Sequence, residues 1–185
     1  MLYDMGFNIS IPMSQDYVEH AIADMDSFFD LVLIVEKMDE SLILLKDHLC
    51  WEYSDIVFLN KNARRGPFVA SLSEEQIQTL EELNKEDVML YQHFLRKHEV
   101  EVDNFGREKM AEEVAKLAGL RQNVTDECNI KTVKGKVAKG KFEEYSEIVD
   151  AFVLDDESDE QCLLMSLPEL ELLDKIRDRQ LERLS

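Results

Sequence analysis

The sequence predicts an α/β fold in which parallel strands are flanked by helices, on the basis of three patterns between residues 28 and 59. Residues 31–35 form an unbroken run of Leu, Val and Ile, which is typical of a strand covered on both faces. The next segment, residues 39–49, has apolar residues at the spacing of an amphipathic helix. A second short strand is expected at residues 55–59. Because strands that alternate with helices favour layered α/β arrangements, we predict a strand-helix-strand unit here.

Capping signals indicate where the first predicted helices begin. Asp39 can cap the helix of residues 39–49, because its carboxylate can accept hydrogen bonds from free amides of the first turn. The sequence SEEQ at residues 73–76 has capping-box spacing and opens a helix that ends near residue 83. Asn84 can then cap a following helix, which we expect to end near residue 98.

The remaining predicted helices lie toward the C-terminal end. Residues 107–117 carry apolar side chains on one face, as expected for a helix that packs on a core. A second capping box, SLPE at residues 166–169, precedes a terminal helix that runs to about residue 184. We therefore expect the C-terminal half of the chain to be rich in helix.

The chain is strongly acidic. Its 185 residues are 33% charged and carry a formal net charge of −19, so its surface would repel nucleic acid and anionic membranes. We predict no nucleic-acid partner. No apolar run reaches the roughly 18 residues of a membrane span, and the Met1 end has the features of neither a signal peptide nor an anchor, so the chain as written would start in the cytosol.

Two blocks of opposite charge lie between the predicted helices. Residues 131–141 (KTVKGKVAKGK) are basic and residues 155–160 (DDESDE) are acidic, and neither block has a hydrophobic period. We interpret them as exposed loops that attract one another. A functional alternative is that the lysines form an anion-binding lip for a sulfate donor or a sulfated sugar. The acidic block lacks the ligand spacing and the glycine of a calcium-binding loop.

Several short sequences resemble the galactose-3-O-sulfotransferase family. The densest matches are FDLV at 29–32, DESL at 39–42, LCW at 49–51 and NAR at 62–64, preceded by MLYDMGF at 1–7. Weaker matches follow at residues 87–94, 105–114, Cys128, Cys162, Pro168-Glu169 and Gln180. The resemblance is dense to about residue 128 and thin afterwards. It suggests one partial sulfotransferase domain over residues 1–185, with an α/β part (1–128), a charged loop region (129–165) and a terminal helix (166–185).

The sequence also departs from the family pattern. Lys37-Met38 stands where the family usually has an aromatic pair, and Leu95 replaces a usual Asn. The segment FLNK at residues 58–61 replaces an aromatic-Lys-Leu approach to the NAR sequence. These differences leave the identity of the acceptor sugar open.

The resemblance implies the C-terminal part of a P-loop-like sulfotransferase fold, with 3′-phosphoadenosine 5′-phosphosulfate as co-substrate. Such enzymes hold the phosphosulfate with a strand-loop-helix that contains Lys and Gly-Ser/Thr. In the Lys-Gly segment at residues 131–141, neither Gly-Lys pair is followed by Ser or Thr, and the segment does not lead from a strand into a helix. We therefore expect the donor loop, and the catalytic residues, to lie in an N-terminal half that these 185 residues lack, with Met1 an internal methionine.

The family also implies a Golgi type II membrane protein with a luminal catalytic domain. The sequons at Asn8 and Asn123 are compatible with glycosylation in the lumen. Cys128 and Cys162 bracket a polar segment that a disulfide could close there, although three free thiols remain an alternative. Cys50, at the end of an apolar helix, is expected to be a buried thiol. No C-x-x-C motif occurs and the histidines are scattered, so no metal site is predicted.

Sulfuryl transfer needs a base for the acceptor hydroxyl and cations that neutralise the transferred group. Glu36, Lys37 and Asp39 follow the first predicted strand, at the edge where open α/β sheets usually bind ligands. Glu36 could orient sugar hydroxyls, and Arg64 or Arg65 could pair with a phosphate or sulfate. The structural alternatives are that Asp39 only caps a helix and that the arginines form surface ion pairs.

Three hypotheses of function follow. The first is a fragment of a sulfotransferase that transfers sulfate to the 3-hydroxyl of galactose in a glycolipid resembling galactosylceramide, or in a glycan, with the fragment inactive by itself. The second is a non-catalytic, truncated acidic module that binds a carbohydrate or a protein partner. The third is a chain without an independent product, which would unfold with poor cooperativity.

Overall fold

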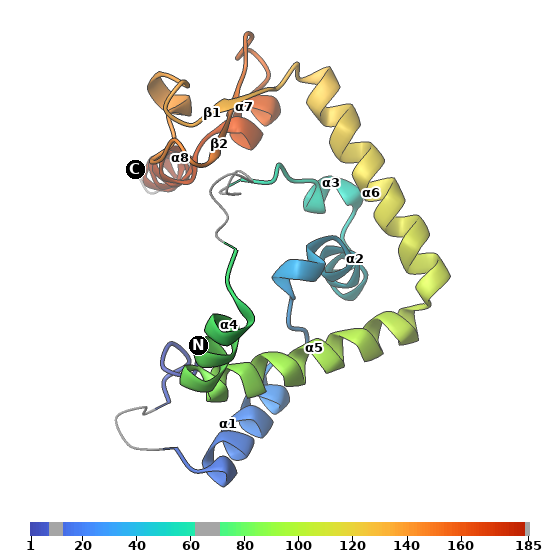
Figure 1. The fold of residues 1–185 in the computed structure, drawn as a ribbon. Helices are drawn as coiled ribbons and strands as arrows, with labels where there is room; N and C mark the ends of the chain where they lie inside the picture. The colour runs from blue at the N-terminus through green and yellow to red at the C-terminus, as the bar shows by residue number, and fades with distance from the viewer. Residues whose placement is uncertain (8–12, 62–70, 184–185) are drawn as a thin grey trace. The chain divides into compact units, whose positions relative to one another are not determined.

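The structure, a computed structural model, describes residues 1–7, 13–61 and 71–183. The chain divides into two compact units, which we describe separately (Figure 1). Unit 1 comprises residues 1–56 and 72–115, and unit 2 comprises residues 57–71 and 116–185.

The described residues of unit 1 are mainly helical. The helices of unit 1 are α1 (Gln15–Phe28), the 3₁₀ turn η1 (Val35–Lys37), α2 (Met38–Leu49), α3 (Tyr53–Ile56), α4 (Glu74–Leu83), α5 (Lys85–Phe105) and the first turns of α6 (Arg107–Glu127). The capping box predicted before α4 is confirmed, because the Ser73 hydroxyl accepts from the Gln76 amide while the Gln76 side chain accepts from the Ser73 amide. α5 extends beyond the predicted end and stops at Gly106, whose φ of 98° favours glycine.

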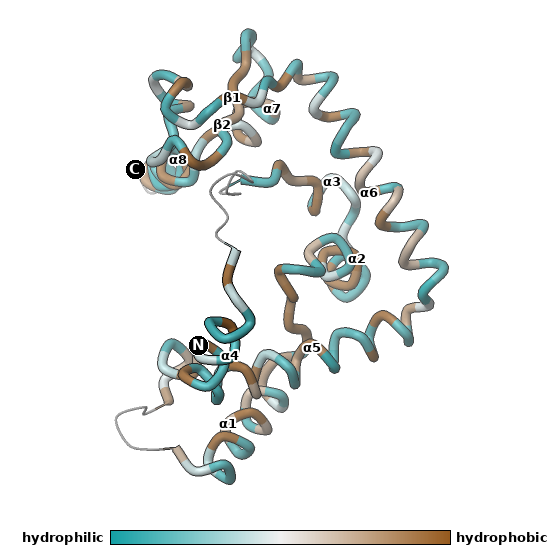
Figure 2. Tube along the Cα trace, viewed as in Figure 1, coloured by the Kyte–Doolittle hydropathy of each residue, from teal (hydrophilic) through white to brown (hydrophobic). Residues whose placement is uncertain are grey.

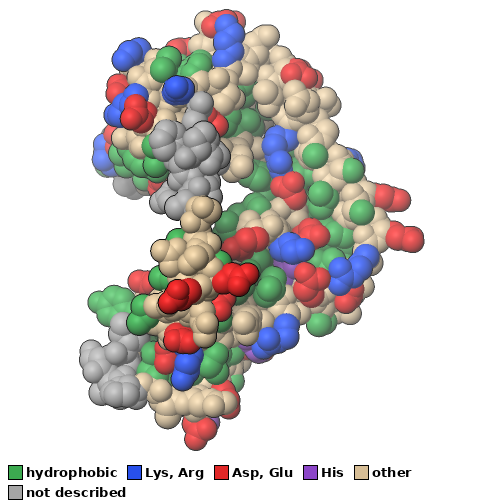
Figure 3. Space-filling view, in the orientation of Figure 1, with side chains coloured by type: hydrophobic (Ala, Val, Ile, Leu, Met, Phe, Trp, Pro, Cys, Tyr) green, Lys and Arg blue, Asp and Glu red, His purple; other side chains and the backbone are tan. Residues whose placement is uncertain are grey.

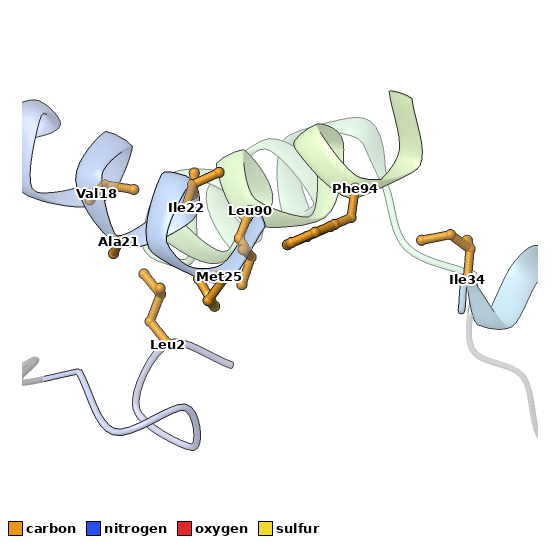
Figure 4. Packing of buried hydrophobic residues seen from close by; sticks show 8 residues of the cluster. All are labelled: Leu2, Val18, Ala21, Ile22, Met25, Ile34, Leu90 and Phe94. Carbon is orange, nitrogen blue, oxygen red and sulfur yellow. The ribbon is translucent and has the colours of Figure 1, made fainter. Parts of the chain in front are cut away.

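The core of unit 1 lies where α1 packs on α5. Val18, Ala21, Ile22 and Met25 form the buried face of α1, and its N-terminus is capped by Ser14. Figure 4 shows these side chains gathered beside Leu90 and Phe94 of α5, with Leu2 reaching toward them and Ile34 pointing toward Phe94. The chain just before α2 is also strongly apolar (Figure 2). Helix α1 therefore supplies half of a core whose existence the sequence analysis did not anticipate.

The described residues of unit 2 form a two-stranded sheet and three α-helices. Its elements are the C-terminal part of α6, β1 (Lys131–Lys134), the 3₁₀ turn η3 (Gly140–Phe142), β2 (Asp150–Val153), α7 (Glu160–Ser166) and α8 (Glu169–Glu182). The strands are antiparallel, with Lys131 opposite Val153 and Lys134 opposite Asp150. Gly135 follows β1 at a close approach, because a Cβ there would lie 2.2 Å from the Ser146 carbonyl oxygen.

A disulfide and two ion pairs join segments of unit 2 that are far apart in the sequence. Cys128, just after α6, is bonded to Cys162 of α7, with 5.6 Å between their Cα atoms. The bridge lies beside a core built from β2, α7 and the segment around η3, including Phe142, Ala151, Leu154, Leu163 and Leu167. Lys131 pairs with Asp155 and Lys141 pairs with Glu157, so the predicted attraction between the two charged blocks is confirmed.

The predicted parallel sheet is wrong for the residues that the structure describes, where β1 and β2 form the only sheet. Residues 31–34 are extended, with Ile34 at φ −103° and ψ 119°, but no described strand lies beside them. Residues expected as the second strand begin in α3 and continue as irregular chain. The physical reason is that an apolar run sets strand preference, whereas a sheet also needs a neighbouring strand to bond its amides and carbonyls.

Three smaller expectations also differ. α2 begins at Met38 with Lys37 at its N-cap position, so Asp39 lies in the first turn and does not cap the helix. Cys50 is exposed, because it ends α2 in the left-handed conformation with φ 54°. Part of the predicted loop region is regular, since β1, β2 and α7 lie within residues 129–165. Across the described residues, the helices are too short or too polar to cross a bilayer.

Candidate functional site

An apolar cavity of about 600 Å³ lies in unit 1. One wall is formed by residues 31–36, which lead into and begin the 3₁₀ turn η1, and the opposite wall is α5, which contributes Leu90, Tyr91 and Phe94. The remaining lining comes from the first turn of the chain and the end of α1, namely Met1, Met5, Met25 and Phe29. Glu36 is the one charged residue in this lining, and its side chain is exposed. A cavity with this volume and composition can enclose an apolar group and present one carboxylate to a polar group attached to it.

A buried hydrogen-bond network holds the wall of the cavity in place. Ser41 of α2 is fully buried, and its Oγ accepts from the Ile34 amide at 3.0 Å. The same oxygen lies 3.3 Å from the Ile34 carbonyl and 3.2 Å from Nε2 of His98 on α5. One hydroxyl therefore ties the extended segment to two helices, and it replaces the strand partner that Ile34 lacks.

His98 is almost wholly enclosed, with 2% of its surface exposed. Burial lowers the pKa of His98 because it disfavours the imidazolium, and the nearby carboxylates of Glu40 and Glu99 only partly oppose this. Its Nδ1 has no hydrogen-bond partner among the described residues. A small cavity of about 10 Å³ is lined by His98, Lys97, Glu101, Phe94 and residues 30–32, which is barely room for one water molecule. We assign His98 a structural role, because its side chain is too enclosed to contact a substrate bound in the large cavity.

The predicted site residues of unit 1 lie close together along the chain but do not form a cationic centre. Lys37 pairs with Glu40 at 3.8 Å and with Glu99 at 3.6 Å. Glu99 also pairs with Arg107 at 3.1 Å, and the pKa of Glu99 is lowered chiefly by the hydrogen bond from this arginine. The cation predicted beside Glu36 is thus already neutralised by carboxylates. Asp39 lies in the first turn of α2, where a negative charge suits the helix dipole.

The other predicted site residues are placed as follows. Arg64, Arg65 and Asn8 lie outside the described residues. Asn123 is exposed on α6, and the hydroxyl of Thr125 in its sequon donates to the Arg121 carbonyl. The structure brings Cys128 and Cys162 together in a disulfide.

The residues described do not fit the phosphosulfate of a nucleotide donor. The Lys-Gly segment runs from β1 through a turn into the 3₁₀ turn η3, so it offers no α-helix N-terminus to a phosphate. Three of its lysines are engaged by carboxylates, in the pairs Lys131–Asp155, Lys136–Glu143 and Lys141–Glu157. The described part of the chain also holds no group of three or more His, Cys, Asp or Glu that could bind a metal ion.

Ser41 and His98 hold the cavity wall in place, and the sequence analysis did not single out either of them. They are 57 residues apart; Ser41 lies within the DESL match at residues 39–42, whereas His98 lies outside the matched segments. The available signal was weak: Ser41 is a small polar residue on the buried side of α2, next to Ile43 and Leu44. A hydroxyl at such a position needs an internal partner, but the sequence does not say which one.

Comparison with known proteins places this site in a family. A sequence model of galactose-3-O-sulfotransferases matches residues 1–140, which include every residue of the cavity. The chain therefore belongs to the galactose-3-O-sulfotransferase family. No solved structure matches it.

Individual relatives agree with this assignment. Galactosylceramide sulfotransferase from Bos taurus is 38% identical over 128 residues, which cover 69% of this chain and 30% of the relative. Galactose-3-O-sulfotransferase 2 from Sus scrofa is 33% identical over 129 residues, covering 69% and 32%. Galactose-3-O-sulfotransferase 4 from Homo sapiens is 29% identical over 205 residues, covering 96% and 42%. The chain thus spans about a third of the length of these relatives.

Proposed function

We propose that this chain is part of a sulfotransferase that transfers sulfate from 3′-phosphoadenosine 5′-phosphosulfate to the 3-hydroxyl of a galactose, with a glycolipid as the favoured acceptor. The observation that carries the choice of a glycolipid is the apolar cavity of about 600 Å³ with Glu36 in its lining. An apolar lipid chain would fill the cavity, and burial of each CH₂ group contributes about 0.8 kcal/mol. Glu36 would accept hydrogen bonds from sugar hydroxyls at the exposed end.

The donor site belongs to another part of the domain in this proposal. Three lysines of the Lys-Gly segment and Lys37 are paired with carboxylates, so in this proposal the electrostatic stabilisation that sulfuryl transfer requires comes from elsewhere. We assign it to an N-terminal part equivalent to the portion of the relatives that has no counterpart here. That part would also provide a strand beside residues 31–34, which have no described strand partner.

We further propose a location in the Golgi lumen, on the lumenal side of the membrane. An exposed sequon at Asn123 and a disulfide between Cys128 and Cys162 suit an oxidising, glycosylating compartment.

A chimera tests the reaction and the role of Glu36 together. Residues 1–128 of this chain would replace the matching region of bovine galactosylceramide sulfotransferase, and transfer of labelled sulfate to galactosylceramide would be measured. We expect activity, and a rise of roughly tenfold in the acceptor KM for Glu36→Gln, since a hydrogen bond to a charged group contributes about 1.5 kcal/mol or more. Glu74→Gln, an exposed residue on α4, is the matched control. A chimera that binds adenosine 3′,5′-bisphosphate but sulfates no galactoside would contradict the proposal.

Lipid binding can be measured on the chain itself. We expect galactosylceramide in nanodiscs to retain the wild-type chain and to lose Leu33→Asp, which puts a charge into the cavity lining. Leu80→Asp makes the same change at an exposed position of α4 and should bind like the wild type. Equal binding of both variants would exclude the cavity as the lipid site. If the chain binds a soluble galactoside but not the lipid, and the chimera is active, a glycan is the favoured acceptor. If it binds the galactoside and the chimera is inactive, the result favours the rival hypothesis of a carbohydrate-binding module.

A further inference from the structure

A second cavity, of about 370 Å³, lies within unit 2. One side is the segment between β1 and β2, and the other is the beginning of α8. The lining residues are Lys136, Gly140, Glu143, Glu144, Tyr145, Pro168, Glu169, Leu170 and Glu171. Most of them lie beyond residue 140, where the match to the sequence model of the family ends. The properties of this cavity therefore have to be read from its own residues.

The beginning of α8 supplies free hydrogen-bond donors to the cavity. Pro168 occupies the N-cap position and makes no side-chain capping bond, and the first amide bonded within the helix is that of Leu172, which donates to the Pro168 carbonyl. The amides of Glu169, Leu170 and Glu171 precede it and have no acceptor within the helix. All three residues line the cavity, so a ligand can receive their hydrogen bonds.

Glu144 supplies a buried acceptor to the same cavity. Only 4% of the residue is exposed, yet its carboxyl group makes no hydrogen bond within the described part of the chain. Lys61 is near enough to interact with it electrostatically, but the Lys61 ammonium donates to the Leu167 carbonyl. Burial raises the pKa of Glu144 and Lys61 opposes this. The carboxyl group of a residue this enclosed has little contact with water, and a ligand hydroxyl that enters the cavity can donate a hydrogen bond to it.

The charges around the cavity exclude an anionic ligand. Glu143, Glu144, Glu169 and Glu171 face a single lysine, Lys136, which is already paired with Glu143 at 3.4 Å. A metal ion does not suit the cavity either, because free amides repel it and no group of three ligating side chains exists among the described residues. Hydroxyl groups both donate and accept hydrogen bonds without net charge, so they suit the free amides and the carboxyl group together.

Tyr145 adds an apolar surface to these polar groups. The residue is 69% exposed and lines the cavity, so its ring can stack on the C–H face of a sugar ring. The volume is in the range of small-molecule sites. We propose that unit 2 contains a binding site for a neutral, hydroxyl-rich ligand, a hexose unit of a glycan, held between the α8 amides, Glu144 and Tyr145. This site lies in a different unit from the apolar cavity and does not depend on the proposed sulfotransferase activity.

The experiment is a titration of the ¹⁵N-labelled, oxidised chain with methyl β-galactoside and methyl β-glucoside, followed by amide chemical shifts. We expect saturable shifts of the Glu169, Leu170 and Glu171 amides with a Kd on the order of 1 mM for at least one hexoside, as expected for a ligand of this size. Sodium sulfate and butylammonium chloride are the charged comparison ligands, and tighter binding of either would overturn the assignment. So would the absence of shifts with both hexosides at about 100 mM.

Variants separate binding from folding. Glu144→Leu removes the acceptor while filling its volume, and should leave the fold intact, because an unbonded buried carboxyl contributes little stability. We expect it to weaken hexoside binding at least fivefold, and Tyr145→Ala to do the same. Glu147→Gln, at an exposed position of the same segment outside the lining, is the control and should bind like the wild type. If Glu144→Leu unfolds, Glu144→Gln replaces it in the test, with a smaller expected loss of hexoside affinity. Unchanged hexoside binding in a folded Glu144 variant and in Tyr145→Ala would refute the site.

Discussion

Replacing Ser41 by Ala tests whether one buried hydroxyl holds the cavity wall of unit 1. The side chain is fully buried, so no water can take its place without a rearrangement. Its loss leaves the Ile34 amide without its acceptor at 3.0 Å. It also leaves both ring nitrogens of His98 unpaired, because Nδ1 already has no partner among the described residues. Each orphaned buried group costs about 1–3 kcal/mol, so we expect a loss of about 3 kcal/mol in total.

Because the chain has two compact units, the loss should be measured locally and not from one global transition. Hydrogen exchange of the α2 and α5 amides gives the opening free energy of unit 1 directly. Ser27→Ala is the matched control: its hydroxyl is exposed and donates only to the Asp24 carbonyl one turn back, so we expect a change below about 0.5 kcal/mol. A loss below about 1 kcal/mol for Ser41→Ala would refute the reasoning, because the hydroxyl would then be replaceable.

Three further measurements address the disulfide, the buried histidine and the sequon. The denatured, unreduced chain should contain one free thiol, and a count of three would contradict the disulfide. Replacing Cys128 and Cys162 by Ser should lower the free energy of unfolding of unit 2 by about 4 kcal/mol, because the disulfide closes a loop of 34 residues. Because the pKa of His98 is lowered in the folded state, the unfolded state binds the proton first as pH falls. The free energy of unfolding should therefore be highest above about pH 6.5 and should decrease as the pH falls from there to the lowered pKa. His98→Gln should flatten this dependence in denaturant titrations, whereas His48→Gln, at an exposed position, should not. When the wild-type chain is expressed through a secretory pathway, treatment with a glycosidase should lower its mass, and the decrease should be smaller for Asn123→Gln. A glycosidase that leaves the mobility of the wild type unchanged would exclude glycosylation.

Local signals in the sequence predicted local structure well. The capping box at Ser73 fixed the start of α4, because both of its hydrogen bonds form within one turn. The second predicted box was only partly right: a terminal helix follows, but Ser166 ends α7 and Pro168 takes the N-cap position of α8. The end of α5 was placed too early, although Gly106 was visible in the sequence as a C-terminal signal.

Sheet formation could not be predicted in the same way, because it depends on residues far away or outside the segment. Residues 31–35 have the composition of a buried strand, and their backbone is extended as far as Ile34. Pairing requires a second strand, about which the run itself contains no information. The chain instead satisfies Ile34 through Ser41 and leaves the apolar side chains around a cavity. The same property that indicates a strand, continuous apolarity, also makes this segment the wall of a lipid-sized cavity.

The two candidate sites differ in what resemblance can contribute to them. Glu36 lies within the family match, and its role beside a sugar hydroxyl was predicted from its position after an expected strand; in the proposed function the cavity would contact the remainder of the acceptor. Glu144 and Tyr145 lie beyond the match, in a segment that composition alone suggested was a solvated loop. Their significance depends on α8, which brings free amides to the same cavity from a segment about 25 residues away. Charge patterning along the chain shows that such residues are polar, whereas only the fold shows which of them are buried together.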